Sequence, residues 1–228
     1  MQSVREATVT LQLYAHPFSS YCQKVLIALY ENATPFTYRV LGPEDPPAFE
    51  ELAALWPLKK FPVLVDGDGP PVIETSIIIE HLDLRHPGPA RMIPLDPAAA
   101  LQARTMDRVF DNYVMTSTQK VVLDHLRPPA DRDAYGVDQA KATLDAIYDW
   151  LDGVMADRTW AVGEAFGLAD CGAAPALFYA DWVHEIGERR PHLAAYRARL
   201  LARPSVARAV EEARPYRSLF PPGAPDRD

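Results

Sequence analysis

The sequence has very little cysteine. Among its 228 residues there are two, Cys22 and Cys171, and they lie far apart in the chain. Two distant cysteines cannot form the disulfide framework that stabilises small secreted domains. Residues 1–8 also lack the basic start and apolar stretch of a secretory signal. We therefore expect a reducing compartment, and the cytoplasm is the simplest location.

The chain also lacks an excess of positive charge. It carries 31 acidic and 23 basic residues, which gives a net charge of -8, whereas proteins that bind nucleic acid usually show a basic balance or a basic stripe. The densest basic stretch, residues 197–208, is interpreted as a solvated helix face. No apolar run is long enough to cross a bilayer. Neither nucleic acid nor a membrane is an expected partner.

A metal-binding pattern is missing as well. The six histidines are scattered, and none stands at a metal-ligand spacing from a cysteine or a carboxylate, so no metal is expected. Hydrophobic residues make up 48% of the chain, enough for an ordinary globular core. The periodicity of these residues therefore carries the information on the fold.

The first part of the chain switches between two periodicities. Val9, Leu11 and Leu13 recur at every second residue, as in a strand, and the apolar residues from Cys22 to Leu29 share one helical face. The later elements of this part are a strand at 36–40, a helix near 49–56, a strand at 61–65, a turn at 66–69, a strand at 71–74 and a helix capped by Thr75 or Ser76. The order βαβαββα over residues 9–86 predicts a small α/β domain with a parallel strand pair and an antiparallel edge.

The rest of the chain has helical spacing only. Residues 87–97 are rich in proline and are interpreted as a linker. Apolar residues at helical spacing predict an all-helical domain over residues 98–214. Residues 215–228 contain several prolines, and we expect them to form an extended tail over the surface.

Residues that could carry chemistry occur where strands give way to helices. Ser19 stands at the first such junction, where unpaired helix amides and the positive end of the helix dipole stabilise an anion or a thiolate. Taken alone, Ser19 or Ser20 is better explained as a plain helix cap. Cys22 lies on the apolar helix face, where a buried and inert thiol is the usual state.

Two further junctions are similarly ambiguous. Pro62 interrupts an apolar strand, and a cis peptide bond at the start of an edge strand would accommodate it. Glu74 offers a carboxylate to an ammonium group, and Thr75 with its amide offers a site for a carboxylate. A helix cap beside a solvated acid explains the same two residues.

In combination, these junctions resemble a known family. Ser19-Ser20-Tyr21-Cys22 resembles the Cys-Pro-Tyr-Cys turn of glutaredoxins with serine in the first position, and Phe61-Pro62-Val63-Leu64 resembles the cis-proline loop of thioredoxin-like domains. Leu168-Ala169-Asp170 and Arg203-Pro204-Ser205-Val206 are similar to motifs in the helical domain of cytosolic glutathione S-transferases. From about Thr10 to Pro215 the chain resembles that family, in its serine-type, bacterial-like form: a thioredoxin-like α/β domain followed by an all-helical (all-α) domain.

The resemblance implies a glutathione transferase with a role in detoxification. Glutathione would be the co-substrate, and its thiol would be ionised for attack on a small hydrophobic electrophile. Ser19 would donate a hydrogen bond to the thiolate, with Tyr14 as the reserve candidate. Lowering a thiol pKa by about two units requires about 2.7 kcal/mol, which one charge-assisted hydrogen bond and a helix end can supply.

The resemblance also assigns binding residues and an assembly. The implied glutathione-binding residues are Ser19, Ser20, Lys60, Phe61, Val63, Glu74 and Thr75, with Pro62 as the structural cis-proline. Met106, Phe110 and Tyr113 are the candidates for the electrophile pocket, although ordinary core packing explains at least half of them better. A homodimer is expected, with the first domain of each chain against the helical domain of the other.

Some residues depart from the family pattern, and rival functions remain open. Gly167 replaces the usual capping serine or threonine, so Asp170 cannot complete a reciprocal capping box and the helix start is expected to be weaker. Thr75 replaces the more usual serine. The rivals are a non-catalytic glutathione- or ligand-binding protein, a glutathione-dependent isomerase, and a glutathione-dependent disulfide or dehydroascorbate reductase. The isomerase subgroup usually has tryptophan where Gln23 stands, and the reductase would need a cysteine at position 19.

Overall fold

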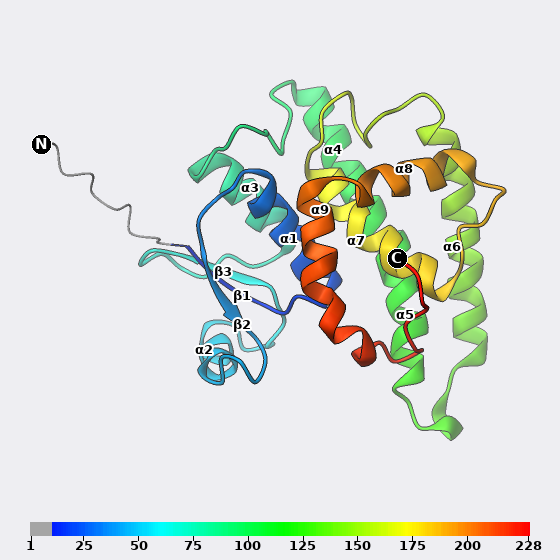
Figure 1. The fold of residues 1–228 in the computed structure, drawn as a ribbon, viewed down its shortest axis with the longest axis horizontal. Coiled ribbons are helices and arrows are strands. Elements are labelled where there is room, and N and C mark those ends of the chain that lie inside the picture. Colours follow the sequence, from blue (N-terminus) through cyan, green and yellow to red (C-terminus); the bar gives the residue numbers. More distant parts are fainter. Residues whose placement is uncertain (1–10) are drawn as a thin grey trace, which may run out of the picture.

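The computed structural model describes residues 11–228, so the expected strand start at Val9 lies outside the described part (Figure 1). The sheet contains β1 (Leu11–Ala15), β2 (Thr37–Val40) and β3 (Val63–Asp66) in the order β2-β1-β3. β1 runs parallel to β2 and antiparallel to β3. The helices of this part are α1 (Ser20–Glu31), α2 (Pro47–Leu55) and α3 (Thr75–Arg85). The expected thioredoxin-like domain is therefore present.

The alternation of residues along β1 separates two cores. Leu11 and Leu13 pack into the large core with α1 and α3. Tyr14 points to the opposite face, where it packs with Val63 of β3 and Leu52 of α2. Because successive side chains of a strand face opposite sides, Tyr14 is directed toward α2.

The expected fourth strand is reduced to one residue pair. Leu64 and Val72 form an isolated antiparallel bridge, in which each amide donates to the other carbonyl at 3.0 and 2.7 Å. Pro70 and Pro71 precede Val72, and proline has no amide hydrogen for a strand ladder. The turn is formed as expected, since the amide of Gly69 donates to the carbonyl of Asp66.

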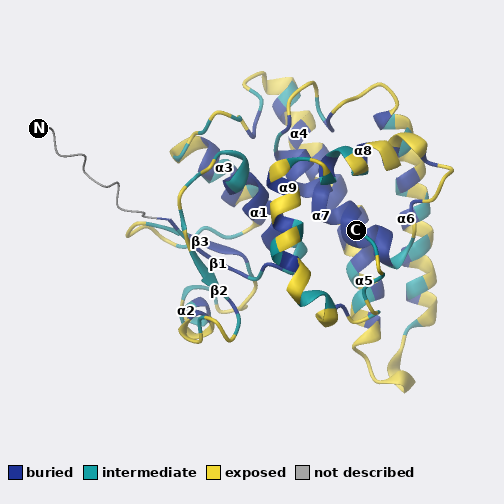
Figure 2. Cartoon of the chain, in the orientation of Figure 1, coloured by how far each residue is buried: buried dark blue, intermediate teal, exposed yellow. Residues whose placement is uncertain are grey.

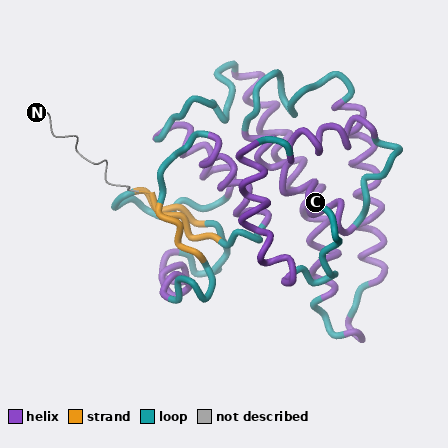
Figure 3. Tube along the Cα trace, in the orientation of Figure 1, coloured by secondary structure: helices purple, strands orange, loops and turns teal. Residues whose placement is uncertain are grey.

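The second part of the described chain is helical, and it fills the side of the molecule away from the sheet (Figure 3). Its elements are α4 (Pro97–Val109), the π-helix η1 (Phe110–Met115), α5 (Thr116–His125), the 3-10 turn η2 (Pro129–Asp131), α6 (Ala134–Met155), α7 (Leu168–Val183), α8 (Pro191–Leu201), α9 (Pro204–Ala213) and the 3-10 helix η3 (Arg214–Leu219). α7 is buried along nearly its whole length at the centre (Figure 2). No helix within residues 11–228 has both the length and the apolar character needed to cross a membrane.

The start of α7 is held without a capping side chain. The carboxylate of Asp170 accepts hydrogen bonds from the amides of Gly167 and Ala161, both at 2.9 Å, and from the hydroxyl of Tyr196 at 2.6 Å. A Cβ atom at Gly167 would lie 2.9 Å from the carbonyl oxygen of Met92, so glycine permits a close backbone approach here. These bonds hold the helix start although the serine or threonine half of the capping box is missing, and a weaker start stays a prediction.

The carboxyl-terminal segment departs from the expected extended tail. It begins with η3, because Pro215 is compatible with the first turn of a helix. The rest folds back onto the helical domain: Asp228 pairs with Arg214 and Arg217 at 2.8 and 3.1 Å, and Arg227 pairs with Asp181. Phe220 is thereby buried against Trp182 and other aromatic rings of α7.

Candidate functional site

Two adjoining cavities lie where the two parts of the chain meet. The first has a volume of about 520 Å³ and is mainly apolar, and the second has about 340 Å³ and is mainly polar. The residues common to both linings are Tyr21, Lys60, Phe61 and Gln119. The apolar cavity extends toward α5 and η3, and the polar cavity extends toward the start of α3. Together they form one continuous candidate site.

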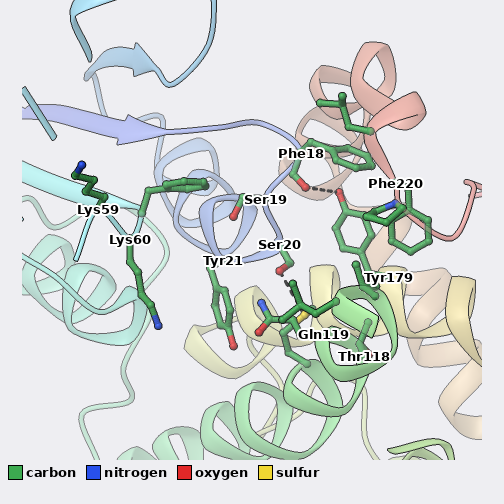
Figure 4. Close-up of a pocket in the computed structure, with 16 residues that line it drawn as sticks. Phe18, Ser19, Ser20, Tyr21, Lys59, Lys60, Thr118, Gln119, Tyr179 and Phe220 are labelled. Carbon is green, nitrogen blue, oxygen red and sulfur yellow. Dashed lines mark hydrogen bonds between the residues drawn. The ribbon is translucent and has the colours of Figure 1, made fainter. Parts of the chain in front are cut away.

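Ser19 lies at the amino-terminal end of α1 and lines the apolar cavity. Its Oγ accepts a hydrogen bond from the amide of Cys22 at 3.4 Å. This bond uses a lone pair of the hydroxyl and not its hydrogen, so the O–H can be directed either to a ligand or to the neighbouring Cys22 sulfur. In Figure 4, Ser19 lies between Lys60 on one side and Phe18 on the other.

The neighbouring Ser20 has a different orientation. Its hydroxyl donates to the sulfur of Met115 in η1 at 3.3 Å (Figure 4). Both serines line the cavity, but the hydroxyl of Ser20 is already engaged by a side chain of the helical domain. Ser19 is therefore the better placed of the two to donate to a ligand atom.

The two cysteines are buried and unpaired. Burial raises the pKa of the Cys22 thiol to about 12, against smaller opposing effects of its hydrogen bonds with Ser19 and His16. Burial also raises the pKa of Cys171. Both shifts favour the protonated thiol, so neither cysteine offers a ready thiolate.

Tyr14 lines neither cavity. Its hydroxyl donates to a carboxylate oxygen of Glu51 in α2 at 2.8 Å. Burial is the largest of the effects that raise the pKa of Tyr14 to about 12. The structure does not bring Tyr14 and Ser19 together, because the side-chain alternation of β1 directs Tyr14 toward α2.

The polar cavity contains the second and third sequence motifs. Pro62, Glu74 and Thr75 line it, and the Phe61–Pro62 peptide bond is cis. Glu74 precedes α3 with a φ of 67°, which few non-glycine residues adopt. Thr75 follows as the first residue of α3, where backbone amides lack intrahelical acceptors. An exposed carboxylate and a helix start thus lie side by side.

Val63 lies outside both cavities. Its side chain is fully buried, and it pairs with Tyr14 of β1. The amide and carbonyl of Leu64 point outward to Val72, so those of the adjacent Val63 face β1. Phe61, two residues earlier, lines both cavities instead.

A buried ion cluster under the polar cavity joins α1 to the helical domain. The Nζ atom of Lys24 lies 2.6 Å from Asp107 and 2.7 Å from Asp111, and the Lys24 side chain is 1% exposed. Arg108 lies 2.7 and 2.5 Å from the same two carboxylates. Ser76 of α3 completes the cluster by donating to Asp107 at 2.6 Å. Sequence analysis missed this cluster, because its members come from distant elements with no common motif.

The residues proposed for the electrophile pocket do not line either cavity. Met106 and Phe110 are buried core residues, as the alternative explanation held, and Tyr113 is 53% exposed. The apolar cavity is lined by a neighbouring face of the same long helical segment, formed by Met115, Thr118, Gln119, Val122 and Leu123. Helical spacing identifies apolar residues, but it does not distinguish a core face from a cavity face.

The remaining wall of the apolar cavity comes from residues that sequence analysis did not single out. Besides Lys59, they are Phe18, Tyr179, Leu219, Phe220 and Pro221. The hydroxyl of Tyr179 donates to the carbonyl of Phe18 at 3.0 Å, and this contact joins α7 to the turn before Ser19 (Figure 4). Four of the five lie in segments with no recognisable motif, so no local signal could have found them.

The fold and the cavity at the start of α1 define a two-domain protein with a thioredoxin-like domain and a helical domain. Residues 13–90 match the family model "Glutathione S-transferase, N-terminal domain", and residues 114–204 match "Glutathione S-transferase, C-terminal domain". The chain therefore belongs to the glutathione S-transferase family.

Individual relatives agree with this assignment. A glutathione S-transferase of Methylobacterium radiotolerans, solved in complex with glutathione sulfonate, is 30% identical with a TM-score of 0.76, over 88% of this chain and 94% of that one. Glutathione S-transferase GstB of Escherichia coli (strain K12) is 26% identical, over 88% of this chain and 97% of the relative. FtsZ-localized protein A of Caulobacter vibrioides is 29% identical, over 78% of this chain and 81% of the relative. The family thus includes relatives whose names do not describe an enzyme.

Proposed function

We propose that this protein is a glutathione transferase that ionises the glutathione thiol for attack on small hydrophobic electrophiles. One observation carries the proposal: the hydroxyl of Ser19 lines the apolar cavity at a helix start, next to the residues that this cavity shares with the polar one, and its bond with the Cys22 amide uses a lone pair and not its hydrogen. The polar cavity suits a charged peptide, and the apolar cavity suits a hydrophobic second substrate. The bound glutathione sulfonate in the Methylobacterium relative supports the choice of ligand.

The polar cavity offers a partner for each end of glutathione. The carboxylate of Glu74 would receive the γ-glutamyl ammonium group, and Thr75 at the start of α3 would receive its carboxylate. Lys60, which is exposed at the edge of both cavities, would pair with the glycyl carboxylate. The backbone of Phe61, in place of that of Val63, would form hydrogen bonds with the cysteinyl residue of glutathione.

In this arrangement the thiol lies at the start of α1. Ser19 donates to the thiolate, and the helix dipole adds to its stabilisation. The thiol proton is released to water, and the thiolate then attacks a carbon atom of the electrophile in the apolar cavity. The carbon–sulfur bond forms as the bond between that carbon and the leaving group breaks, and the leaving group departs with the electron pair of the broken bond. Cys22 takes no part, because its raised pKa keeps it protonated.

We also propose a homodimer in the cytoplasm. Three apolar side chains on neighbouring elements are exposed in the single chain: Ile77 of α3 (54%), Leu101 of α4 (66%) and Tyr113 of η1 (53%). A second copy of the chain would cover them. The unpaired thiols of Cys22 and Cys171 suit a reducing compartment. Sedimentation of the chain alone and of a Leu101→Glu variant tests the assembly: we expect a dimer and a monomer, respectively.

The decisive test compares two serines in one turn. Ser19→Ala should lower kcat/KM for a reactive aromatic halide by about 10- to 100-fold, because the charge-assisted hydrogen bond to the thiolate, worth about 1.5–3 kcal/mol, is lost while the helix end remains. The pKa of bound glutathione, followed by thiolate absorbance, should rise by about one to two units. Ser20→Ala is the matched control, and we expect less than about threefold change because its hydroxyl is directed to Met115.

The result also separates the enzyme from a binding protein. Full activity and an unchanged thiol pKa in Ser19→Ala would refute the role of Ser19. Calorimetric binding of glutathione without turnover of aromatic halides, epoxides, enones or peroxides would favour the non-catalytic alternative. The similarity to FtsZ-localized protein A makes that alternative worth testing.

A further inference from the structure

Three metal-ligating side chains meet at the carboxyl-terminal end of α3. Asp66 ends β3, His81 belongs to the last turns of α3, and His86 follows that helix as its C-cap. The Nε2 atoms of His81 and His86 lie 2.9 and 2.7 Å from the same oxygen of Asp66. One nitrogen from each ring and this oxygen all lie within 4.8 Å of one another.

The spacing of these atoms is close to that of a metal site. A tetrahedral ion with ligand bonds of about 2.0–2.1 Å separates its ligands by roughly 3.3 Å. Shifts of about half an ångström would therefore open the present contacts far enough to admit an ion. The three side chains are 22–28% exposed, so an ion and a completing water ligand have access.

The chemistry of the three ligands selects the kind of ion. Imidazole suits zinc, copper and nickel, whereas calcium and magnesium prefer oxygen ligands only. We propose that Asp66, His81 and His86 bind one divalent transition-metal ion, with Zn²⁺ as the probe of choice. The Nε2 atoms of His81 and His86 coordinate the ion through their lone pairs. Both rings are then neutral and carry their proton on Nδ1.

The place of this site separates it from the glutathione site. His86 follows Thr75 by eleven positions, the length of α3, which at 1.5 Å per residue is roughly 16 Å. The ion does not reach glutathione. It clamps the turn after β3 to the end of α3, and because it binds only the folded chain it raises the thermal stability.

The sequence gives no hint of this site because its histidines are not at a helical ligand spacing. Residues five apart on a helix are turned about 140° from one another. His86 has left the helix, with φ -131° and ψ 54°, and this conformation returns its ring toward His81. Asp66 arrives from a different element.

Calorimetric titration of the tag-free protein with Zn²⁺ tests the proposal. We expect one equivalent per chain and a saturable rise in Tm. His81→Ala, His86→Ala and Asp66→Asn should each weaken binding at least about tenfold. The matched controls are His125→Ala and His192→Ala, which remove exposed imidazoles elsewhere and should leave binding unchanged. Absorption of the Co²⁺-loaded protein should show a low-coordinate site that Asp66→Asn alters.

The possible outcomes are distinct. Absence of saturable binding, binding that follows the control histidines, or binding unchanged in all three site variants would overturn the proposal. If His86→Ala lowers Tm but Zn²⁺ has no effect on the wild-type Tm, the three residues are only a structural contact. Should a histidine variant fail to fold, Asp66→Asn decides, because it keeps the shape of the side chain. Activity of Ser19 variants has no bearing on this result.

Discussion

The polar and apolar cavities of the candidate site are built in different ways. The polar cavity depends on two junctions of the first domain, the loop at Pro62 before β3 and Glu74–Thr75 at the start of α3, with α4 and η1 completing it. The apolar cavity is assembled from five separate segments, which include Tyr179 of α7 and the carboxyl-terminal Phe220. The first takes its character from backbone geometry, and the second from tertiary packing.

This difference suggests a division of labour. Backbone amides and a positive-φ residue provide fixed groups for a constant ligand, and such groups change little when side chains are substituted. A wall of apolar side chains from distant segments can vary in shape without disturbing the fold. We therefore expect the polar cavity to determine glutathione binding and the apolar cavity to determine the choice of electrophile.

The largest effect is expected where the polar cavity joins the helical domain. Lys24→Met removes the buried cation between Asp107 and Asp111. Breaking a buried ion pair by removing one partner costs about 3–5 kcal/mol, and we expect a decrease of this size in the free energy of unfolding, measured with urea. Glutathione affinity should fall with it, since α1 and Asp111 border the site.

The matched control is Arg104→Met, which breaks an exposed ion pair with Glu80 at 2.8 Å between α4 and α3. Exposed pairs contribute about 0–1 kcal/mol, so this variant should be close to wild type. Equal losses in the two variants would show that the buried cluster has no special role in joining the two parts.

An intermediate effect is expected at the glutathione ammonium. Glu74→Gln keeps the side-chain shape and removes the charge that would pair with it. A charge-assisted hydrogen bond contributes about 1.5–3 kcal/mol, so the KM for glutathione should rise about 10- to 100-fold while the KM for the electrophile stays the same. Glu80→Gln, farther along α3, is the control. A change in the electrophile KM alone would contradict the division of labour.

The polar cavity was largely predictable, for a physical reason. Its residues stand a fixed number of positions from the ends of strands and the starts of helices, and these boundaries can be located in the sequence. Pro62, Glu74 and Thr75 all line the polar cavity, although their roles in binding glutathione stay predictions. Val63 differs, because whether a backbone group faces a strand or a ligand depends on the register of the β1–β3 pair.

The apolar cavity was not predictable in the same way. Met106 and Phe110 have the spacing of a pocket-lining stripe, but they face the core, and no periodicity reports which face of a helix meets a void. The π-helix η1 lies within this segment, and an extra residue per turn rotates the following side chains. The role of Phe220 was not predictable for a related reason. The proline-rich tail has no periodicity, and only tertiary contacts such as the ion pair of Arg227 with Asp181 hold the tail against the cavity.

The smallest effect is expected in the apolar wall, and it tests the comparison most sharply. Val122→Phe adds volume inside the cavity of about 520 Å³. The kcat/KM for a bulky aromatic electrophile should fall roughly fivefold relative to a small one, since crowding of about 1 kcal/mol changes a rate ratio by that factor. The glutathione affinity should not change. Leu126→Phe, which is 65% exposed near the end of α5, controls for the added ring. If Val122→Phe weakened glutathione binding as much as electrophile turnover, the two cavities would act as one site, and the separation argued from their construction would fail.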